Sequence, residues 1–358
     1  MSMTFKYLVP SSLLVSAAVG CGGLFGVDFD DAIPLADAAV DSPQDDGGYS
    51  QADGSDASTI PCEGGGCPAE PSKVVLFGGY DGTNLLDDTW EWDGATWTLR
   101  DVKGARPPAR ATSAMASLHG KAVLFGGQSA SSYLEDTWEW DGTAWTVRTV
   151  GVAPPARAHH TLVPLGDKLV LFGGADGATI FADTWEWDGA TWLKVTTTSQ
   201  PDSRETAAMA TRGDKAVLFG GFVRTDHDAY GDDTWEWDGA SWTSRAVTTR
   251  PEPRDARTMA TLSGDCILFG GWNGTKHLAD TWAWNGATWT MRTVVASPPA
   301  RDRHALATLN GKIVLFGGGN NYKPYQDDTW EWDGATWRQR TTSTAPSPRA
   351  NHAMTARP

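Results

Sequence analysis

The sequence has 358 residues, with 29 Lys and Arg against 44 Asp and Glu, and a formal net charge of −15. The charge is uneven: residues 22–72 hold nine Asp, two Glu and no Lys or Arg, whereas 27 basic and 33 acidic residues follow from Val74 onward. A nearly balanced body beside a purely acidic segment excludes the basic surface that a nucleic-acid-binding protein needs.

The first 21 residues have the layout of an export signal. Lys6 precedes a mostly apolar stretch from Leu8 to Val19, which is too short and too often interrupted to span a bilayer as a helix. Small residues then lead to Cys21. The pattern resembles a bacterial lipoprotein signal, which implies that Cys21 is lipidated and begins the mature chain. An ordinary secretory signal followed by an incidental Cys is the alternative.

Residues 22–72 are predicted to form a disordered acidic tether. They are rich in Asp, Ala, Gly, Ser and Pro, and they cannot bury enough apolar surface to offset their chain entropy. A flexible chain of about fifty residues has a typical reach of about 40 Å. That reach would hold a folded domain clear of a membrane surface.

The cysteines fit an exported protein. Cys62 and Cys67 flank a Glu-Gly-Gly-Gly stretch, which predicts a local disulfide in an oxidising compartment. A metal-binding pair is the alternative, but no second Cys or His pair lies nearby in the sequence to complete the ligands. Cys266 lies in an apolar run and is predicted to be a small buried residue.

From Lys73 onward the sequence consists of repeats of about 47 residues. Each copy contains an apolar run ending in Phe-Gly-Gly, then Asp-Thr-Trp-Glu-Trp-Asp-Gly, and then a separate Trp; the fifth copy reads Asp-Thr-Trp-Ala-Trp-Asn-Gly. An Arg precedes every Phe-Gly-Gly after the first. The first glycines of the six copies are Gly78, Gly126, Gly173, Gly220, Gly270 and Gly317. A fixed period of this kind indicates an array of equal structural units.

Each repeat predicts four short antiparallel strands, A to D. In the second repeat, strand A is expected over Ala111–Leu118, the continuously apolar strand B over Ala122–Phe125, and strand C over Thr137–Trp140. The hairpin Asp141-Gly142 then returns the chain to strand D around Trp145. Four antiparallel strands in a unit of this size are the pattern of a β-propeller blade.

Six copies predict six blades, and the order of the strands predicts a closed ring. The chain enters the first repeat at strand B, Val74–Phe77, and finishes with a strand A at Pro348–Ala356. That last strand is expected to complete the first blade, which leaves no open edge. The fold prediction is an all-β, six-bladed β-propeller over residues 73–358.

The repeat also resembles a known family. An apolar strand ending in Gly-Gly, a Trp-containing strand and a separate Trp resemble the kelch repeat of galactose-oxidase-like propellers. The resemblance covers Lys73 to Pro358 and rests on six copies in phase. It implies the propeller fold, whereas the fold by itself implies no particular activity.

Residues repeated in every blade are interpreted as scaffold. Eighteen of the nineteen Trp fall into three positions per blade, and we expect them to pack blade against blade. The Asp before each Thr-Trp is expected to satisfy backbone donors at the start of strand C. The A–B and C–D turns are nearly the same in every repeat, so the end of the propeller that they form is predicted to be plain scaffold.

The B–C and D–A loops emerge at the other end and vary between repeats. They carry aromatic and His side chains suited to stacking on sugar rings or anchoring a protein partner. Alternatively, several of these side chains cap the core or stiffen the loops. The candidate ligand-binding residues on these loops are Tyr80, Tyr133, Phe222, Tyr230, Trp272, His277, Tyr322 and Tyr325, beside His227.

One position in strand A adds two further candidates to the loop residues. His160, His304 and His352 each stand three residues after the repeated Arg, and Arg257 takes the same place in another blade. Inner packing of the blade is one interpretation. In the other, Arg257 and His304 join the repeated arginines in a basic channel mouth that attracts an anionic ligand, so both are candidate ligand-binding residues.

The kelch resemblance brings two enzymatic alternatives. A galactose-oxidase-like copper site needs two His, two Tyr and a Cys joined to one Tyr, and Cys266 lies in a buried strand without such a set. A six-bladed sialic-acid mutarotase would use channel-facing Arg, His and Glu as acid–base groups. The acids near strand A are Glu205, Asp255 and Asp302, and no pairing among them is distinctive. We predict no cofactor, no metal and no catalytic residue.

The resulting functional prediction is a lipid-anchored recognition module of the bacterial cell envelope. It is predicted to be monomeric and to bind a carbohydrate or a protein through its B–C and D–A loops. A kelch-type sugar mutarotase and a structural surface protein are the alternatives.

Overall fold

The computed structural model describes residues 72–224, 229–255, 258–320 and 324–357. These ranges form twenty-seven strands with the turns and loops between them, and they contain no helix. A helix able to cross a membrane is accordingly absent from the described ranges. Cys21, Cys62 and Cys67 lie outside them, so the lipidation and the disulfide stay predictions.

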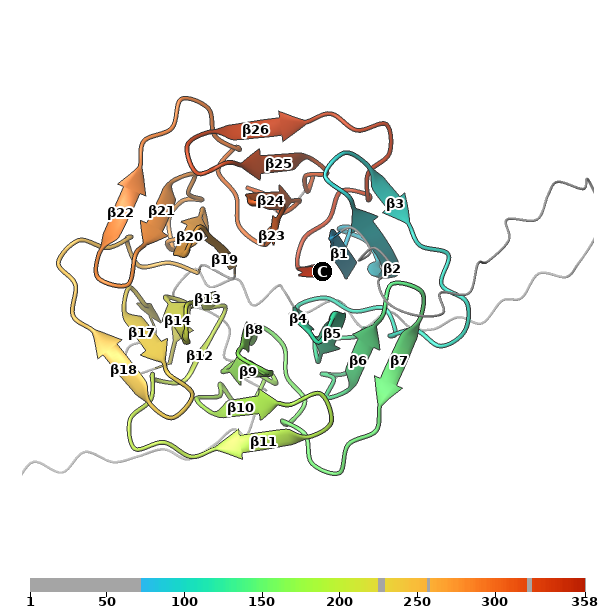
Figure 1. Ribbon diagram of the computed structural model, residues 1–358, viewed down its shortest axis with the longest axis horizontal. Coiled ribbons are helices and arrows are strands. Elements are labelled where there is room, and N and C mark those ends of the chain that lie inside the picture. Colours follow the sequence, from blue (N-terminus) through green and yellow to red (C-terminus); the bar gives the residue numbers. More distant parts are fainter. Residues whose placement is uncertain (1–71, 225–228, 256–257, 321–323, 358) are drawn as a thin grey trace, which may run out of the picture. The chain divides into compact units, whose positions relative to one another are not determined.

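Six four-stranded antiparallel sheets surround a common centre as the blades of a propeller (Figure 1). Blade 1 contains β27 (Ala353–Arg357), β1 (Lys73–Tyr80), β2 (Leu85–Trp92) and β3 (Trp97–Leu99). Blade 2 contains β4 (Ala114–Leu118), β5 (Lys121–Phe125), β6 (Thr137–Trp140) and β7 (Trp145–Arg148). Blade 3 contains β8 (Thr161–Leu165), β9 (Lys168–Phe172), β10 (Thr184–Trp187) and β11 (Trp192–Val195).

The second half of the chain repeats this order with one addition. Blade 4 contains β13 (Ala208–Arg212), β14 (Lys215–Phe219), β17 (Thr234–Trp237) and β18 (Trp242–Arg245). Blade 5 contains β19 (Met259–Leu262), β20 (Asp265–Phe269), β21 (Thr281–Trp284) and β22 (Trp289–Arg292). Blade 6 contains β23 (Ala305–Leu309), β24 (Lys312–Phe316), β25 (Thr329–Trp332) and β26 (Trp337–Arg340). A small sheet of β12 (Arg204–Glu205), β15 (Phe222–Val223) and β16 (Ala229–Tyr230) is added in the loops of blade 4.

The C-terminal strand closes the ring, as predicted. β27 pairs antiparallel with β1, from Lys73 opposite Arg357 to Phe77 opposite Ala353. The innermost strands β27, β4, β8, β13, β19 and β23 each lie beside those of the two neighbouring blades (Figure 1). The predicted six-bladed fold is therefore confirmed.

The apolar core lies between the blades. Trp92 and Trp97 of blade 1 are buried in one cluster with Phe316 of blade 6, and the ring centroids of Trp97 and Phe316 are 5.1 Å apart. The predicted packing role is confirmed for the second and third Trp of each repeat. The first Trp is half-buried in most blades, and its indole donates to the Asp two residues earlier, as Trp90 does to Asp88 (2.7 Å).

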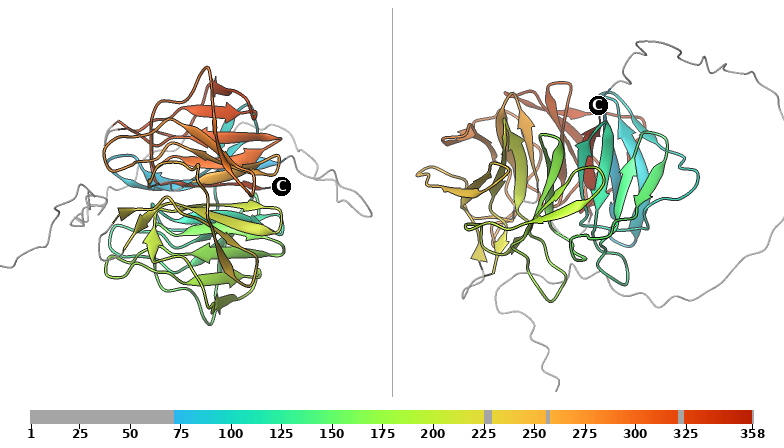
Figure 2. Two further views of the ribbon diagram at one scale, coloured as in Figure 1. Left: turned by 90° about the vertical axis from the view of Figure 1, so that its left-hand side faces the viewer. Right: turned by 60° about the horizontal axis from the view of Figure 1, so that its bottom comes forward.

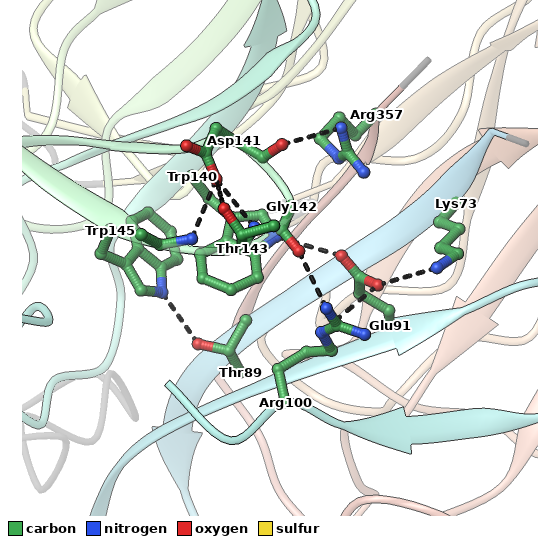
Figure 3. Close-up of polar contacts among 11 residues, drawn as sticks. Lys73, Thr89, Glu91, Arg100, Trp140, Asp141, Gly142, Thr143, Trp145 and Arg357 are labelled. Carbon is green, nitrogen blue, oxygen red and sulfur yellow. Dashed lines mark hydrogen bonds and ion pairs between the residues drawn. The ribbon is translucent and has the colours of Figure 1, made fainter. Parts of the chain in front are cut away.

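Each interface between blades contains one buried hydrogen bond of the same kind. In Figure 3 the indole Nε1 of Trp145 donates to the Thr89 hydroxyl of the preceding blade at 2.9 Å. Beside it, Glu91 accepts from Trp140 (3.1 Å) and pairs with Lys73 (3.2 Å). The other five indole–hydroxyl pairs are Trp97–Thr329, Trp192–Thr137, Trp242–Thr184, Trp289–Thr234 and Trp337–Thr281.

The strands of every blade run between two faces of the ring (Figure 2). We name them the turn face, formed by the A–B and C–D turns, and the loop face, formed by the B–C and D–A loops. This arrangement separates the repeated turns from the variable loops.

Candidate functional site

The first residue of each C–D turn, on the turn face, is hydrogen-bonded within the turn itself. Asp188 begins the C–D turn of blade 3, and its Oδ1 accepts from the backbone N–H of Ala190 (2.8 Å) and Thr191 (2.7 Å). The N–H of Thr191 and then that of Ala190 lower the pKa of the Asp188 carboxyl. The same turn recurs at Asp93, Asp141, Asp238, Asn285 and Asp333. These side chains therefore serve the turns of the scaffold.

The repeated arginines are buried inside the blades. Arg157 is fully buried and forms a two-pronged ion pair with Asp183, with Nη1–Oδ1 at 2.6 Å and Nη2–Oδ2 at 3.0 Å. Arg157 also donates to the carbonyl oxygens of Gly173 (2.9 Å) and Pro155 (3.0 Å). Burial raises the pKa of Asp183, but the hydrogen bond and charge of Arg157 more than offset it, so the pKa is lowered.

This arrangement corrects two expectations from the sequence. The repeated arginines neutralise the Asp of the Asp-Thr-Trp motif and do not form a basic channel mouth. That Asp accepts from the Arg and the following Trp instead of capping strand C. The equivalent pairs are Arg110–Asp136, Arg204–Asp233, Arg254–Asp280, Arg301–Asp328 and Arg349–Asp88.

The Gly-Gly pair carries the chain from strand B onto the loop face. Gly78 and Gly79 have φ angles of 65° and 101°, which favour glycine. A Cβ on Gly78 would lie 2.7 Å from the Arg110 carbonyl oxygen, so the second blade approaches too closely for a side chain. The residue after the pair then forms an isolated bridge with the segment that precedes strand A, as Trp272 does with Asp255.

The predicted aromatic residues form neighbouring pairs on the loop face. The ring centroids of Trp272 and His277 are 4.6 Å apart, those of Phe222 and Tyr230 5.9 Å, and those of Tyr80 and Tyr325 6.3 Å. Phe222 and Tyr325 are buried, whereas Tyr80, Tyr133, Tyr230, Trp272 and His277 are partly exposed. Tyr322, Arg257 and His227 lie outside the described residues. Ligand binding by all of these residues stays a prediction.

Tyr133 links two blades. It lies against Gly177 of the next loop, where a Cβ would be 3.1 Å from the Tyr133 hydroxyl oxygen. Burial, followed by the charges of Glu205 and Asp176, raises the pKa of this hydroxyl. The loops of blades 2 and 3 therefore touch on the loop face, with carboxylates close to an aromatic ring.

The three histidines that directly precede strand A are buried beside the channel. The His160 ring meets Phe125 of the preceding blade edge-on at 5.4 Å, and His304 and His352 meet Phe269 and Phe316 in the same way. Desolvation, and then the charge of Arg157, lowers the pKa of His160 to about 3. Desolvation and Arg301 lower that of His304 to about 3. His304 is thus neutral at neutral pH and adds no positive charge to the channel.

These histidines predict a pH dependence of stability. Below pH 6.5 the unfolded chain binds a proton at His160 and at His304, but the folded chain does not until about pH 3. Desolvation and the charge of Arg349 also lower the pKa of His352 well below its ordinary value. Stability is therefore expected to fall as the pH falls from 6.5 towards 4, by up to about 1.4 kcal/mol per pH unit for each His. Denaturant unfolding at pH 7 and pH 5 measures this loss.

A single substitution measures the contribution of one His to the pH dependence of stability. Blade 4 carries Ala207 at this position, so we choose His160→Ala. Its loss of stability between pH 7 and pH 5 is expected to be about 2 kcal/mol smaller than that of the wild type. The exposed His119→Ala variant is the control and is expected to retain the full loss. Equal losses in His160→Ala and the wild type would contradict the burial argument.

A ring of polar residues encircles the end of the channel at the loop face. We name Thr112, His159, Thr206, Arg303 and Asn351 the mouth ring; each stands two residues after a repeated Arg. All five have φ angles of 58–60°, in the left-handed region. The equivalent Ala256 lies outside the described residues.

Backbone hydrogen bonds join the mouth ring from blade to blade. The Asn351 N–H donates to the Arg303 carbonyl (3.0 Å) and the Thr112 N–H to that of Asn351 (2.8 Å). The His159 N–H donates to Thr112 (3.0 Å) and the Thr206 N–H to His159 (2.9 Å). Sequence reasoning missed this ring. One signal in the sequence could have indicated the ring. The second residue after the repeated Arg differs between blades, is polar in five of them, and is never Gly.

The mouth ring opens into the central cavity. This cavity has a volume of about 570 Å³ and is lined by strand A residues of all six blades, with His160, His304 and His352 among them. A volume of this size lies within the range of small-ligand sites.

One half of the mouth is charged. The residue after the repeated Arg is Glu205, Asp255 or Asp302 in blades 4 to 6, whereas it is Ala111, Ala158 or Ala350 in the other three. Asp302 Oδ1 lies 3.5 Å from His277 Nε2, and Asp302 Oδ2 lies 3.6 Å from Arg303 Nε. Because three blades fold with Ala here, the propeller does not require these carboxylates.

The described residues contain no group of three or more His, Cys, Asp or Glu that could hold a metal ion. Cys266 is buried, and desolvation raises the pKa of its thiol to about 12. The thiol therefore stays protonated at neutral pH, as expected of a packing residue.

Comparison with known proteins agrees with the repeat pattern and the ring. The sequence matches the family model of the KLHDC2/KLHL20/DRC7 Kelch-repeats domain over the overlapping residues 49–221, 141–297 and 189–357. No curated protein matches the chain. Propellers of this type generally mediate protein interactions. With six Gly-Gly blades closed by the C-terminal strand and a family match across them, the chain belongs to the kelch-repeat family.

Proposed function

We propose that this propeller is a recognition module that binds a protein partner on its loop face, around the mouth ring. The kelch family supports the class of partner. The mouth ring is the observation that carries the proposal, because its side chains occupy a position where the backbone favours glycine.

The Gly-Gly bend and the mouth ring both have left-handed backbone, but they differ in the residues that adopt it. A left-handed conformation costs a non-glycine residue roughly 1–2 kcal/mol, and a β-branched Thr is especially disfavoured there. Wherever the Gly-Gly bend is described, its positive φ angles belong to glycine. At the mouth the chain instead retains Thr, His, Arg and Asn. The backbone hydrogen bonds that join the ring need none of these side chains, although the Thr206 hydroxyl also accepts from the Phe222 N–H (3.3 Å). The variety of polar side chains at this position therefore supports a role in contacting a partner.

A carbohydrate is the second candidate partner. The partly exposed Trp272, tilted against His277, is an aromatic surface of the type on which sugar rings stack. We place the module at the bacterial cell envelope, anchored through Cys21, on the basis of the signal-like first 21 residues. A Cys21→Ser variant is expected in the soluble fraction, and retention in the membrane fraction would contradict the anchor.

Glycine substitutions test the mouth ring without straining the backbone. The ring variant carries Thr112→Gly, His159→Gly, Thr206→Gly and Asn351→Gly. Each change is expected to alter the free energy of unfolding by less than about 1 kcal/mol, since glycine adopts this conformation freely. The turn variant carries His119→Gly, Ser263→Gly and Asn310→Gly, at left-handed positions of the turn face.

Both variants and the wild type are compared in affinity capture from envelope extracts and on a glycan array. A partner that binds the wild type and the turn variant but not the ring variant supports the proposal. The same bound set on all three chains would refute it. If only glycan binding is lost in the ring variant, a carbohydrate replaces a protein as the proposed partner.

A further inference from the structure

The two faces of the propeller differ in how their charges are paired. On the turn face, the Glu of strand C pairs with a Lys at the start of strand B in five blades, as Glu186 does with Lys168 (2.7 Å). Several loop-face cations are already paired as well: Lys103–Asp101, Arg106–Asp87 and Arg250–Asp232. These loop-face cations are already neutralised by the carboxylates with which they pair. They are therefore not available to the other carboxylates of this face.

The remaining carboxylates stand on the B–C and D–A loops of the loop face. Six of them have no ion-pair partner in the part of the chain that the structure describes: Asp81, Glu135, Asp176, Asp202, Glu252 and Asp327. They come from the B–C loops of blades 1, 2, 3 and 6 and from the D–A loops that lead into blades 4 and 5. Among the described residues, Lys276 is a cation of this face without a carboxylate partner, and carboxylates outnumber the unpaired cations there.

The same loops present the partly exposed aromatic rings. Tyr80 precedes Asp81, and Tyr133 precedes Glu135 by two residues. Trp272 follows Gly271 and lies beside Asn273, whose amide donates to Glu252 (2.9 Å). An aromatic face next to a carboxylate is a favourable environment for an ammonium or guanidinium group. Carboxylates that have no cation partner also steer cationic partners towards a binding surface, and this holds for Asp81 and Asp176 although each accepts backbone N–H bonds in its own loop.

We infer that the partner segment held on the loop face is a cationic polypeptide, rich in Lys and Arg. This inference rests on the proposed function and adds the chemistry of the partner. It differs from the anionic ligand expected for a basic channel mouth, because the repeated arginines are neutralised inside the blades and His304 is uncharged.

The test uses selection from a random twelve-residue peptide display library on the full chain. Peptides that bind the acidic tether are first removed on an immobilised synthetic peptide of residues 22–72. The loop-neutral variant carries Glu135→Gln, Asp202→Asn, Glu252→Gln and Asp327→Asn, all at exposed positions. The matched control removes four exposed carboxylates of the turn face, through Asp167→Asn, Asp214→Asn, Asp238→Asn and Asp333→Asn.

The control changes the net charge by the same amount, and Asn285 shows that Asn fits the C–D turn. We expect selected peptides to be enriched in Lys and Arg. Their affinity should fall about tenfold in the loop-neutral variant, because each surface charge contributes less than about 1 kcal/mol. Affinity for the turn-face control is expected to be unchanged.

The other outcomes separate the two proposals. Neutral or acidic peptides that depend on the mouth ring would overturn the cationic partner and leave the proposed function standing. Cationic peptides that bind the loop-neutral variant equally well would also overturn the inference. If no selected peptide depends on either the loop carboxylates or the ring variant, both proposals fail for polypeptide partners.

Discussion

An Arg157→Met variant is expected to unfold about 3–5 kcal/mol more easily than the wild type. The substitution removes four hydrogen bonds and leaves the Asp183 carboxylate, whose side chain is only 12% exposed, without its guanidinium. A buried charge that loses its partner carries the full desolvation penalty. Five other blades contain the same pair, and in this blade Lys194 Nζ lies 3.9 Å from Asp183 as a second, more exposed cation.

Two controls separate this effect from a general loss of charge. Arg106 pairs with Asp87 at 2.9 Å, but both side chains are at least one-third exposed, so Arg106→Met is expected to cost less than about 1 kcal/mol. Arg157→Lys keeps the charge but loses the planar fork, and an intermediate loss is expected. Denaturant unfolding followed by tryptophan fluorescence measures all three. A loss below 1 kcal/mol for Arg157→Met would contradict the buried-pair argument.

A chain that stops at Asn351 is expected not to fold cooperatively. The truncation removes β27, and with it the five residue pairs with β1 and the packing of Met354 in the core between blades 1 and 6. It also exposes the edge of β1, a strand whose central residues are buried in the intact ring. Blades 2 and 6 each lose a neighbour of their innermost strand, so the damage extends over three blades.

The Thr355→Ala variant is the matched control, because it keeps the strand and its backbone pairing with Val75. It is expected to retain the wild-type near-ultraviolet circular dichroism and a cooperative thermal transition. A truncated chain that retains both would show that five blades and three strands suffice, contrary to the closure argument.

The fold was predictable because its signals repeat in phase. The six Phe-Gly-Gly and Asp-Thr-Trp copies gave the blade number, and strand C of blade 2 was predicted with its observed bounds, Thr137–Trp140. Strand A was predicted from Ala111 but begins at Ala114. The difference arises at Thr112, whose left-handed backbone turns the chain before the strand begins.

The site was harder to predict for two physical reasons. The partner of Arg157 lies 26 residues away, so the pair is visible in the sequence only as two motifs that always occur together. The mouth ring depends on a backbone angle that no side-chain pattern encodes, and the differences between Thr112, His159 and Asn351 resemble ordinary variation. The aromatic candidates were chosen by residue type, which does not distinguish the buried Phe222 from the partly exposed Trp272.

The indole–hydroxyl hydrogen bond between blades has a consequence for how such proteins change over evolutionary time. Every Trp of this kind donates to the Thr of the preceding blade, and the interface between blades 6 and 1 uses the same pair as the other five. Each blade can therefore form the same indole–hydroxyl hydrogen bond with any other blade as its neighbour. Duplication or loss of one copy would preserve the indole donor and the hydroxyl acceptor at every interface between blades.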